Sequence, residues 1–278
     1  MTRMGLFKIA VGVGVAYLAL ILLIALAQDR LLFPRWAMRG GAVPLPPAAE
    51  RVTVDVPGVG PLAGVFLPAE VAPPAEAALL LGFGGNAWDA DLLAIYLHSV
   101  FPDRDVVTFH YRGYGPSAGQ PGAEAILADS ARIYDEITAA HEAERIVAVG
   151  LSLGAGPAAH LASLRPVHGL ILVTPFDSIE ALARDLYPWL PVRLLLRHRM
   201  DVAGALARSS AKVAVIAAEQ DEIVPPRRTE ALRRATDDVV MDRVIAGVGH
   251  NDIYDSSAFV AAMRDALSVI EGRNGRAR

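Results

Sequence analysis

A serine lies at the turn between a predicted buried strand and a predicted helix. The segment Gly150-Leu151-Ser152-Leu153-Gly154 follows an apolar run and precedes a helical stretch. A nucleophile at such a turn sits in strained backbone, and glycines two residues before and after it prevent clashes between strand and helix. The helix N-terminus also directs its amide groups to the place where an oxyanion would form. This context favours a nucleophilic Ser152 over a chance match in a glycine-containing loop.

Two further side chains lie where a general base and its acid are expected. In this arrangement the acid and then the histidine follow the serine, each in a loop after a later strand. His250 follows the last predicted strand, and Asp221 follows the strand before it. His110 stays open as an alternative base and Asp177 as an alternative acid. We expect Ser152, Asp221 and His250 to form a catalytic triad.

The oxyanion hole is expected to use two backbone amides. One belongs to Leu153, and the other comes from the glycine-rich loop 82–87, where Asn86 is the expected donor. The same loop matches a dinucleotide-binding pattern, which supports an alternative oxidoreductase hypothesis. That hypothesis requires an acidic residue at the end of the following strand, where His110 stands instead.

Short apolar runs alternate with amphipathic stretches through most of the chain. The runs are continuous rather than alternating, which indicates strands buried on both faces in a mostly parallel sheet covered by helices. The first two runs flank a Pro/Gly turn and predict an antiparallel pair. Strands are predicted at 52–56, 62–67, 77–81, 106–109, 145–149, 170–173, 213–217 and 239–245, and helices at 89–100, 121–141, 153–164, 228–235 and 257–271.

The apolar segment within residues 1–27 is not expected to be part of the globular fold. Residues 9–27 carry no charge and would span roughly 28 Å as a helix, close to the thickness of a hydrocarbon core. We expect an uncleaved single-pass membrane anchor. The alternative is a secretory signal cleaved before Gln28, because a small-x-small pattern precedes that residue. Positive charges flank both ends, so the side of the membrane is not determined.

The remaining organisation follows from composition. A Pro/Gly-containing juxtamembrane linker is expected at 28–50, a catalytic domain at 51–271 and a tail at 272–278. With 53% hydrophobic residues, a net charge of −4 and a pI near 6.0, the chain predicts a packed globular protein without a basic surface for nucleic acid. It has no cysteine, so disulfides and cysteine chemistry are excluded.

A cap over the nucleophile is predicted at residues 176–210, within the long connection between two strands. Its many apolar residues either pack the cap onto the domain or form an acyl-binding wall, and the sequence weighs the two equally. Leu190 and Leu194 are the candidate substrate-binding residues. The predicted partners are therefore a small-molecule acyl substrate, lipid-like if the wall is real, and a membrane.

Several segments resemble the single-spanning membrane α/β-hydrolases of the bud-emergence type. The more specific ones are the Tyr-Arg-Gly-Tyr-Gly block and the segment around Pro188; the matching stretches are 28–34, 111–117, 150–154, 188–192, 221–225 and 249–251. The resemblance implies the α/β-hydrolase fold, with Ser152, Asp221 and His250 at the triad positions and Asn86 in the oxyanion loop. Two positions depart from the family pattern, because Gly84 stands where such proteins usually have His and His110 stands where Asp is common.

These observations predict hydrolysis of an ester, thioester or amide through an acyl-Ser152 intermediate. Such chemistry requires no metal and no organic cofactor. A different class of function is a catalytically silent, membrane-anchored binding protein on the same scaffold, since a fold does not fix a function.

Overall fold

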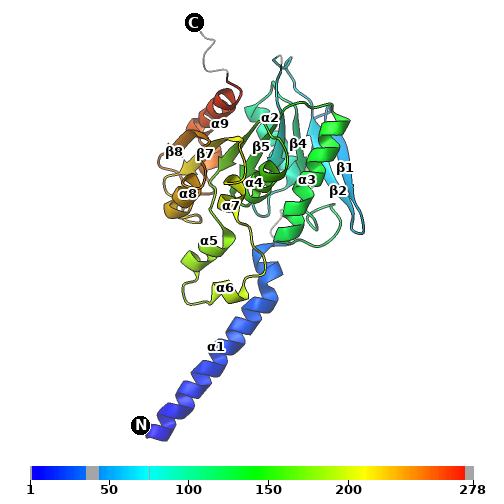
Figure 1. Cartoon of the computed structure of the whole chain (residues 1–278). Helices are drawn as coiled ribbons and strands as arrows, with labels where there is room; N and C mark the ends of the chain where they lie inside the picture. Colours follow the sequence, from blue (N-terminus) through cyan, green and yellow to red (C-terminus); the bar gives the residue numbers. More distant parts are fainter. Residues whose placement is uncertain (1, 36–43, 75, 273–278) are drawn as a thin grey trace.

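An eight-stranded sheet forms the centre of the chain (Figure 1). The computed structural model describes residues 2–35, 44–74 and 76–272, so parts of the predicted linker (36–43) and tail (273–278) lie outside the described residues. The strand order is β1-β2-β4-β3-β5-β6-β7-β8, in which β1, β2 and β4 pair antiparallel and the other neighbours are parallel. The strands are β1 Glu50–Val56, β2 Gly60–Leu67, β3 Leu79–Phe83, β4 Val106–Phe109, β5 Ile146–Leu151, β6 Gly169–Val173, β7 Lys212–Ala218 and β8 Val239–Ile245. The predicted mostly parallel sheet is confirmed.

Helices cover both faces of the sheet, because alternate strand residues point to opposite sides. Leu80 and Val147 belong to one apolar cluster with α2 and α9, whereas Leu81 and Ala148 belong to a second cluster with α3 and α4. The helices that cover the sheet are α2 Ala90–Val100, α3 Ala123–Ala140, α4 Ala155–Leu164, α8 Pro226–Arg233 and α9 Ser257–Ile270. The strands are therefore held between two apolar layers, and the ends of the parallel strands are fixed relative to one another.

Three short helices follow β6 within the predicted cap region. They are α5 Ile179–Leu186, α6 Val192–Leu195 and α7 Val202–Leu206. An isolated antiparallel bridge between Ser178 and Asp201 closes the base of this excursion. In Figure 1, α5 and α6 extend from the same side of the domain as the C-terminal end of α1 (Arg3–Leu32).

Helix α1 extends away from the domain as a long rod (Figure 1). Among the described residues it is the one helix long and apolar enough to cross a membrane, a test that an N-terminal signal sequence also meets. Its apolar side chains are mostly exposed to solvent, since no other part of the described chain covers them.

The last turn of α1 packs into the domain. Gln28 is 5% exposed and Phe33, just after the helix, is 1% exposed within the same apolar cluster as α3 and α4. The region predicted as a linker at 28–50 thus begins as helix. Gln28 and Asp29 end the apolar run, but Gln28, Arg30 and Leu31 are good helix formers, which agrees with the continuation of the helix through Leu32.

Candidate active site

Ser152 lies directly after β5, in backbone that few residues adopt. Its φ is +50°, in the left-handed region. A Cβ at Gly150 would lie 2.6 Å from the carbonyl oxygen of Gly154, and a Cβ at Gly154 would lie 2.0 Å from that of Phe83. Both glycines are therefore sterically required, and they let the strand pass tightly into the short helical turn Ser152–Gly154 that leads to α4.

The imidazole of His250 lies between Ser152 and Asp221. Its Nε2 is 2.9 Å from Ser152 Oγ, and its Nδ1 is 2.9 Å from both carboxylate oxygens of Asp221. An ionised carboxylate only accepts hydrogen bonds, so Nδ1 donates to Asp221 and Nε2 is left to accept from the Ser152 hydroxyl. In this arrangement Nε2 can take the hydroxyl proton, and Asp221 can stabilise the imidazolium that results.

Backbone amides and a neighbouring carboxylate hold the two loops that carry Asp221 and His250. The amides of Ile223 and Val224 donate to Asp221 Oδ1 at 3.0 and 2.6 Å. Glu222 Oε2 accepts from the backbone amide of His250 at 3.2 Å. From the sequence, Glu222 is expected to be only a solvated loop charge, because a carboxylate next to the acid in a loop has no spacing that distinguishes it.

The two open alternatives have other partners. Asp177 forms an ion pair with Arg228 at 3.1 Å; burial raises the pKa of the Asp177 carboxyl, and the charge of Arg228 opposes that shift. His110 is buried, with Nε2 at 3.5 Å from Asp91. The contact with Ser152 is made by His250. We therefore keep Asp221 and His250 as the candidate acid and base.

The glycine-rich loop after β3 lies against the serine. A Cβ at Gly85 would be 3.7 Å from Ser152 Cβ. The side chain of Asn86 is engaged elsewhere, because its Nδ2 donates to the carbonyl of Leu32 at 2.8 Å and its Oδ1 accepts from Tyr114 at 3.1 Å. Only the backbone amide of Asn86 is thus available as the candidate oxyanion donor, beside that of Leu153.

Two tyrosine hydroxyls hold this loop. Tyr111 donates to the carbonyl of Gly84 at 2.7 Å, and Tyr114 donates to Asn86. Burial raises the pKa of both tyrosines, which keeps their hydroxyls protonated as donors. The Tyr-Arg-Gly-Tyr-Gly block is a specific motif, but the motif alone predicts no role for its two tyrosines. Their role follows from the strand order, because β4 neighbours β3 in the sheet and the residues after the two strands meet.

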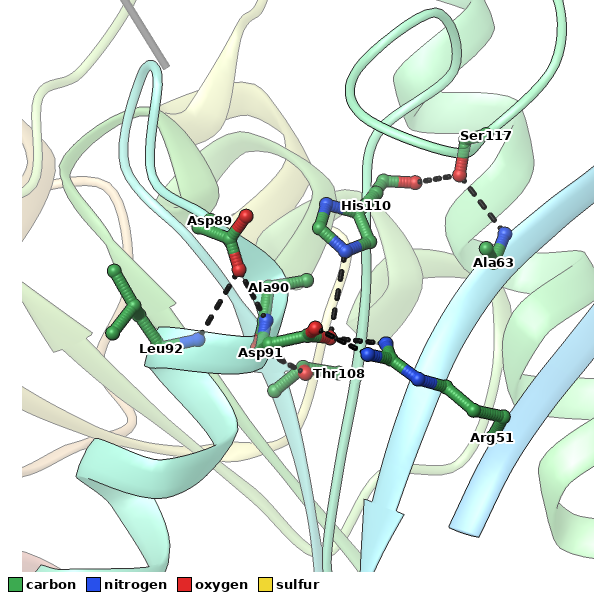
Figure 2. A network of polar contacts seen from close by, with 9 residues as sticks. All are labelled: Arg51, Ala63, Asp89, Ala90, Asp91, Leu92, Thr108, His110 and Ser117. Atoms are coloured by element: carbon green, nitrogen blue, oxygen red, sulfur yellow. Dashed lines mark hydrogen bonds and ion pairs between the residues drawn. The ribbon is translucent and has the colours of Figure 1, made fainter. Parts of the chain in front are cut away.

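A polar network around the buried side chains of Asp91 and His110 fixes the start of α2, just beyond the same loop (Figure 2). Arg51 of β1 donates to both oxygens of Asp91 at 2.7 Å, and the His110 ring faces the same carboxylate. Asp89 caps the helix by accepting from the amide of Asp91 at 2.9 Å. The network ties β1, β4 and α2 together, so the β3-α2 loop is held at both of its ends.

Part of this network has the spacing of a metal site. Ligand atoms of Asp89, Asp91 and His110 lie within 4.8 Å of one another, the only such group in the described part of the chain. However, the guanidinium of Arg51 already compensates the charge of Asp91 and uses both of its oxygens. The residues present therefore fit a structural ion pair better than a cation site.

An apolar groove lies between α1 and the cap, and only one of the two candidate substrate-binding residues lines it. Its volume is about 350 Å³, within the range of small-molecule sites. Leu190 lines it. Leu194 is 87% exposed and lies outside that lining, because on the single turn of α6 it points away from its neighbour Leu195, which does line the groove.

Comparisons with known proteins agree with the architecture. The model of the family described as "alpha/beta hydrolase fold" matches residues 79–200. An uncharacterized protein of Mycobacterium tuberculosis is 33% identical over 249 residues, which cover 87% of each chain. An uncharacterized membrane protein of Saccharomyces cerevisiae is 30% identical over 128 residues, 44% of this chain and 45% of that protein.

Similarity also extends to solved structures. The structure of alpha/beta hydrolase domain-containing protein 10 from mouse matches 81% of this chain and 100% of that one, with a TM-score of 0.62 and 18% sequence identity. Such a low identity supports the fold alone. Together with the family model and the mycobacterial relative, it shows that the chain belongs to the α/β-hydrolase fold family.

Proposed function

We propose that this chain is a serine hydrolase that cleaves acyl esters through a Ser152-Asp221-His250 triad. The observation that carries the proposal is the position of the His250 imidazole, at 2.9 Å from Ser152 Oγ on one side and from Asp221 on the other. A nucleophile, a base and an orienting acid in one chain of hydrogen bonds are the parts that acyl transfer requires.

The reaction follows from these positions. Ser152 Oγ attacks the carbonyl carbon while His250 Nε2 takes the hydroxyl proton, and the amides of Leu153 and Asn86 stabilise the oxyanion. When the tetrahedral intermediate collapses, the bond to the leaving alcohol breaks and His250 returns the proton to the alcohol oxygen. Water then attacks the acyl-Ser152 ester with His250 again as base. The products are a carboxylic acid, the alcohol and free enzyme.

We further propose that α1 is retained as a membrane anchor and that the protein is of the bud-emergence type. The length and apolar character of α1 support the first point. The second is supported by the Tyr-Arg-Gly-Tyr-Gly block, whose two tyrosines contact the oxyanion loop. The name of the yeast relative, a membrane protein, is consistent with the first point.

Turnover of a chromogenic ester tests the proposed function. Full-length protein in detergent should release 4-nitrophenol from 4-nitrophenyl butyrate, and Ser152→Ala or His250→Ala should each lower kcat by at least about 1,000-fold. Thioester and amide analogues with the same acyl group then rank the bonds that are cleaved. Equal turnover by the parent and both folded variants would contradict the proposal.

A further inference from the structure

One wall of the apolar groove comes from α1 itself rather than from the hydrolase domain alone. Ile24, Leu31 and Leu32 of α1 face Tyr187, Leu190 and Leu195 of the cap. Figure 1 shows the C-terminal part of α1 running beside α5 and α6. Residues of all three helices line the groove. A groove built in this way exists only while α1 is docked.

With α1 packed against the cap, the lining of the groove is almost entirely apolar. Apart from the aromatic residues Tyr187 and Trp189, Gln28 is the one polar side chain in its lining, and both ends of its amide are hydrogen-bonded. Its Nε2 donates to the carbonyl of Leu195 at 2.7 Å, and its Oε1 accepts from the amide of Arg197 at 3.0 Å. Because buried polar groups are stable only when hydrogen-bonded, these bonds hold the helix against the cap without adding a polar group that would repel an apolar ligand.

The end of the groove at Leu32 adjoins the glycine-rich loop after β3. Leu32 lines the groove, and its carbonyl accepts from Asn86. Gly85, next to Asn86, approaches Ser152 closely enough that a Cβ there would lie 3.7 Å from the serine Cβ. The wall of the groove at Leu32 is thus joined, through Asn86, to the loop that lies against Ser152.

The outer end of the groove lies along the apolar span. The hydroxyl of Tyr17, within residues 9–27, donates to the carbonyl of Trp189 at 2.7 Å, so the cap runs beside α1 from Leu32 back to Tyr17. These positions are roughly 22 Å apart along a helix. Trp189 and Tyr187 are about half exposed there, and amphipathic aromatic rings of this kind concentrate at membrane interfaces.

We propose that the groove binds the acyl chain of a bilayer lipid, which enters sideways from the membrane and brings its ester to Ser152. This inference rests on the proposed function and adds its substrate class. The occupant follows from the surroundings of the groove, because a groove that opens along a membrane helix faces lipid chains rather than water. Each methylene transferred into it would raise kcat/KM by up to about fourfold.

The test compares two esters that share one leaving group. Full-length protein is reconstituted in phosphatidylcholine vesicles that contain either 4-methylumbelliferyl oleate, which resides in the bilayer, or the water-soluble butyrate. Ile24→Trp and Leu190→Trp fill the groove from its two walls, and each should lower the ratio of oleate to butyrate hydrolysis at least tenfold. Leu186→Trp is the matched control, since Leu186 is an exposed cap leucine outside the groove lining, and it should preserve the ratio.

Labelling of Ser152 by a fluorophosphonate separates this inference from the proposed function. If the parent is labelled and hydrolyses the butyrate while both groove variants keep the parental ratio, the groove is not the acyl site and only the inference fails. A crosslinked dimer that both groove variants abolish, with the ratio unchanged, would identify a second copy as the occupant and also overturn it. If the parent is neither labelled nor active, the proposed function fails and the inference fails with it.

Discussion

The side-chain amide of Asn86 donates a hydrogen bond of 2.8 Å to the backbone carbonyl of Leu32, the last residue of α1. A residue of the candidate oxyanion loop is thereby joined to the end of the helix expected to anchor the chain. The same turn buries Phe33 in the domain core. Helix α1 is thus joined to the domain that carries the candidate site, and changes in the last turn of α1 should affect both stability and turnover.

Loss of the Phe33 ring should destabilise the domain. Phe33 is 1% exposed, so Phe33→Ala removes a buried ring and leaves a cavity, which lowers the free energy of unfolding by about 3–5 kcal/mol. Thermal unfolding in detergent measures this. Val71→Ala is the control, because Val71 is 57% exposed and its loss should shift Tm little. Equal shifts for the two variants would mean that the segment after α1 is not part of the core.

Removal of the Tyr114 hydroxyl should slow catalysis without weakening binding. The hydroxyl donates to Asn86 at 3.1 Å and so positions the oxyanion loop. Tyr114→Phe should lower kcat roughly fivefold, the equivalent of one hydrogen bond, with KM unchanged. Tyr134→Phe deletes an exposed hydroxyl that bonds to Pro166 and should leave kcat unchanged. A rise in KM with constant kcat would instead place Tyr114 in substrate binding.

The two carboxylates considered as triad acid should behave differently. Asp221→Asn should reduce kcat by about 10⁴-fold, because His250 loses the partner that fixes its tautomer. Asp177→Asn should retain turnover, since Asp177 pairs with Arg228. Steady-state kinetics of both variants, with circular dichroism as a check on folding, decides between them. The reverse pattern would make Asp177 the acid.

Retention of α1 predicts an intact N-terminus on the mature protein. Gln28 and Leu32 connect the helix to the cap and the oxyanion loop, so an uncleaved chain keeps both contacts. The protein should remain with the membrane fraction after a carbonate wash, and N-terminal sequencing should begin at or near Met1. A sequence that begins at Gln28 would establish a cleaved signal instead and would remove Ile24 from the groove.

The sheet and the nucleophile turn could be predicted from the sequence because their causes are local. Continuous apolar runs specify buried parallel strands, and the glycines around Ser152 are sterically required by the turn itself. The predicted residues Ser152, Asp221 and His250 lie together because they follow the carboxyl ends of β5, β7 and β8, which are at the same edge of the parallel part of the sheet.

Other features depend on contacts between distant segments. The docking of Gln28 on Leu195 and the exposure of Leu194 follow from how α1 and α6 pack, which no periodicity of either segment encodes. The hydroxyl contacts of Tyr111 and Tyr114 likewise depend on the order of strands in the sheet. Such partners become visible only when the segments are placed in space.

Covalent labelling of Ser152 tests the central claim most directly. Full-length protein treated with a fluorescent fluorophosphonate should incorporate the label at Ser152, because the hydroxyl lies 2.9 Å from His250 Nε2 and is activated by it. Ser152→Ala should abolish the label, and peptide mapping should find the adduct in the peptide that contains Gly150–Gly154. Absence of label in the folded parent, or equal labelling of folded Ser152→Ala, would contradict the assignment of Ser152 as the nucleophile.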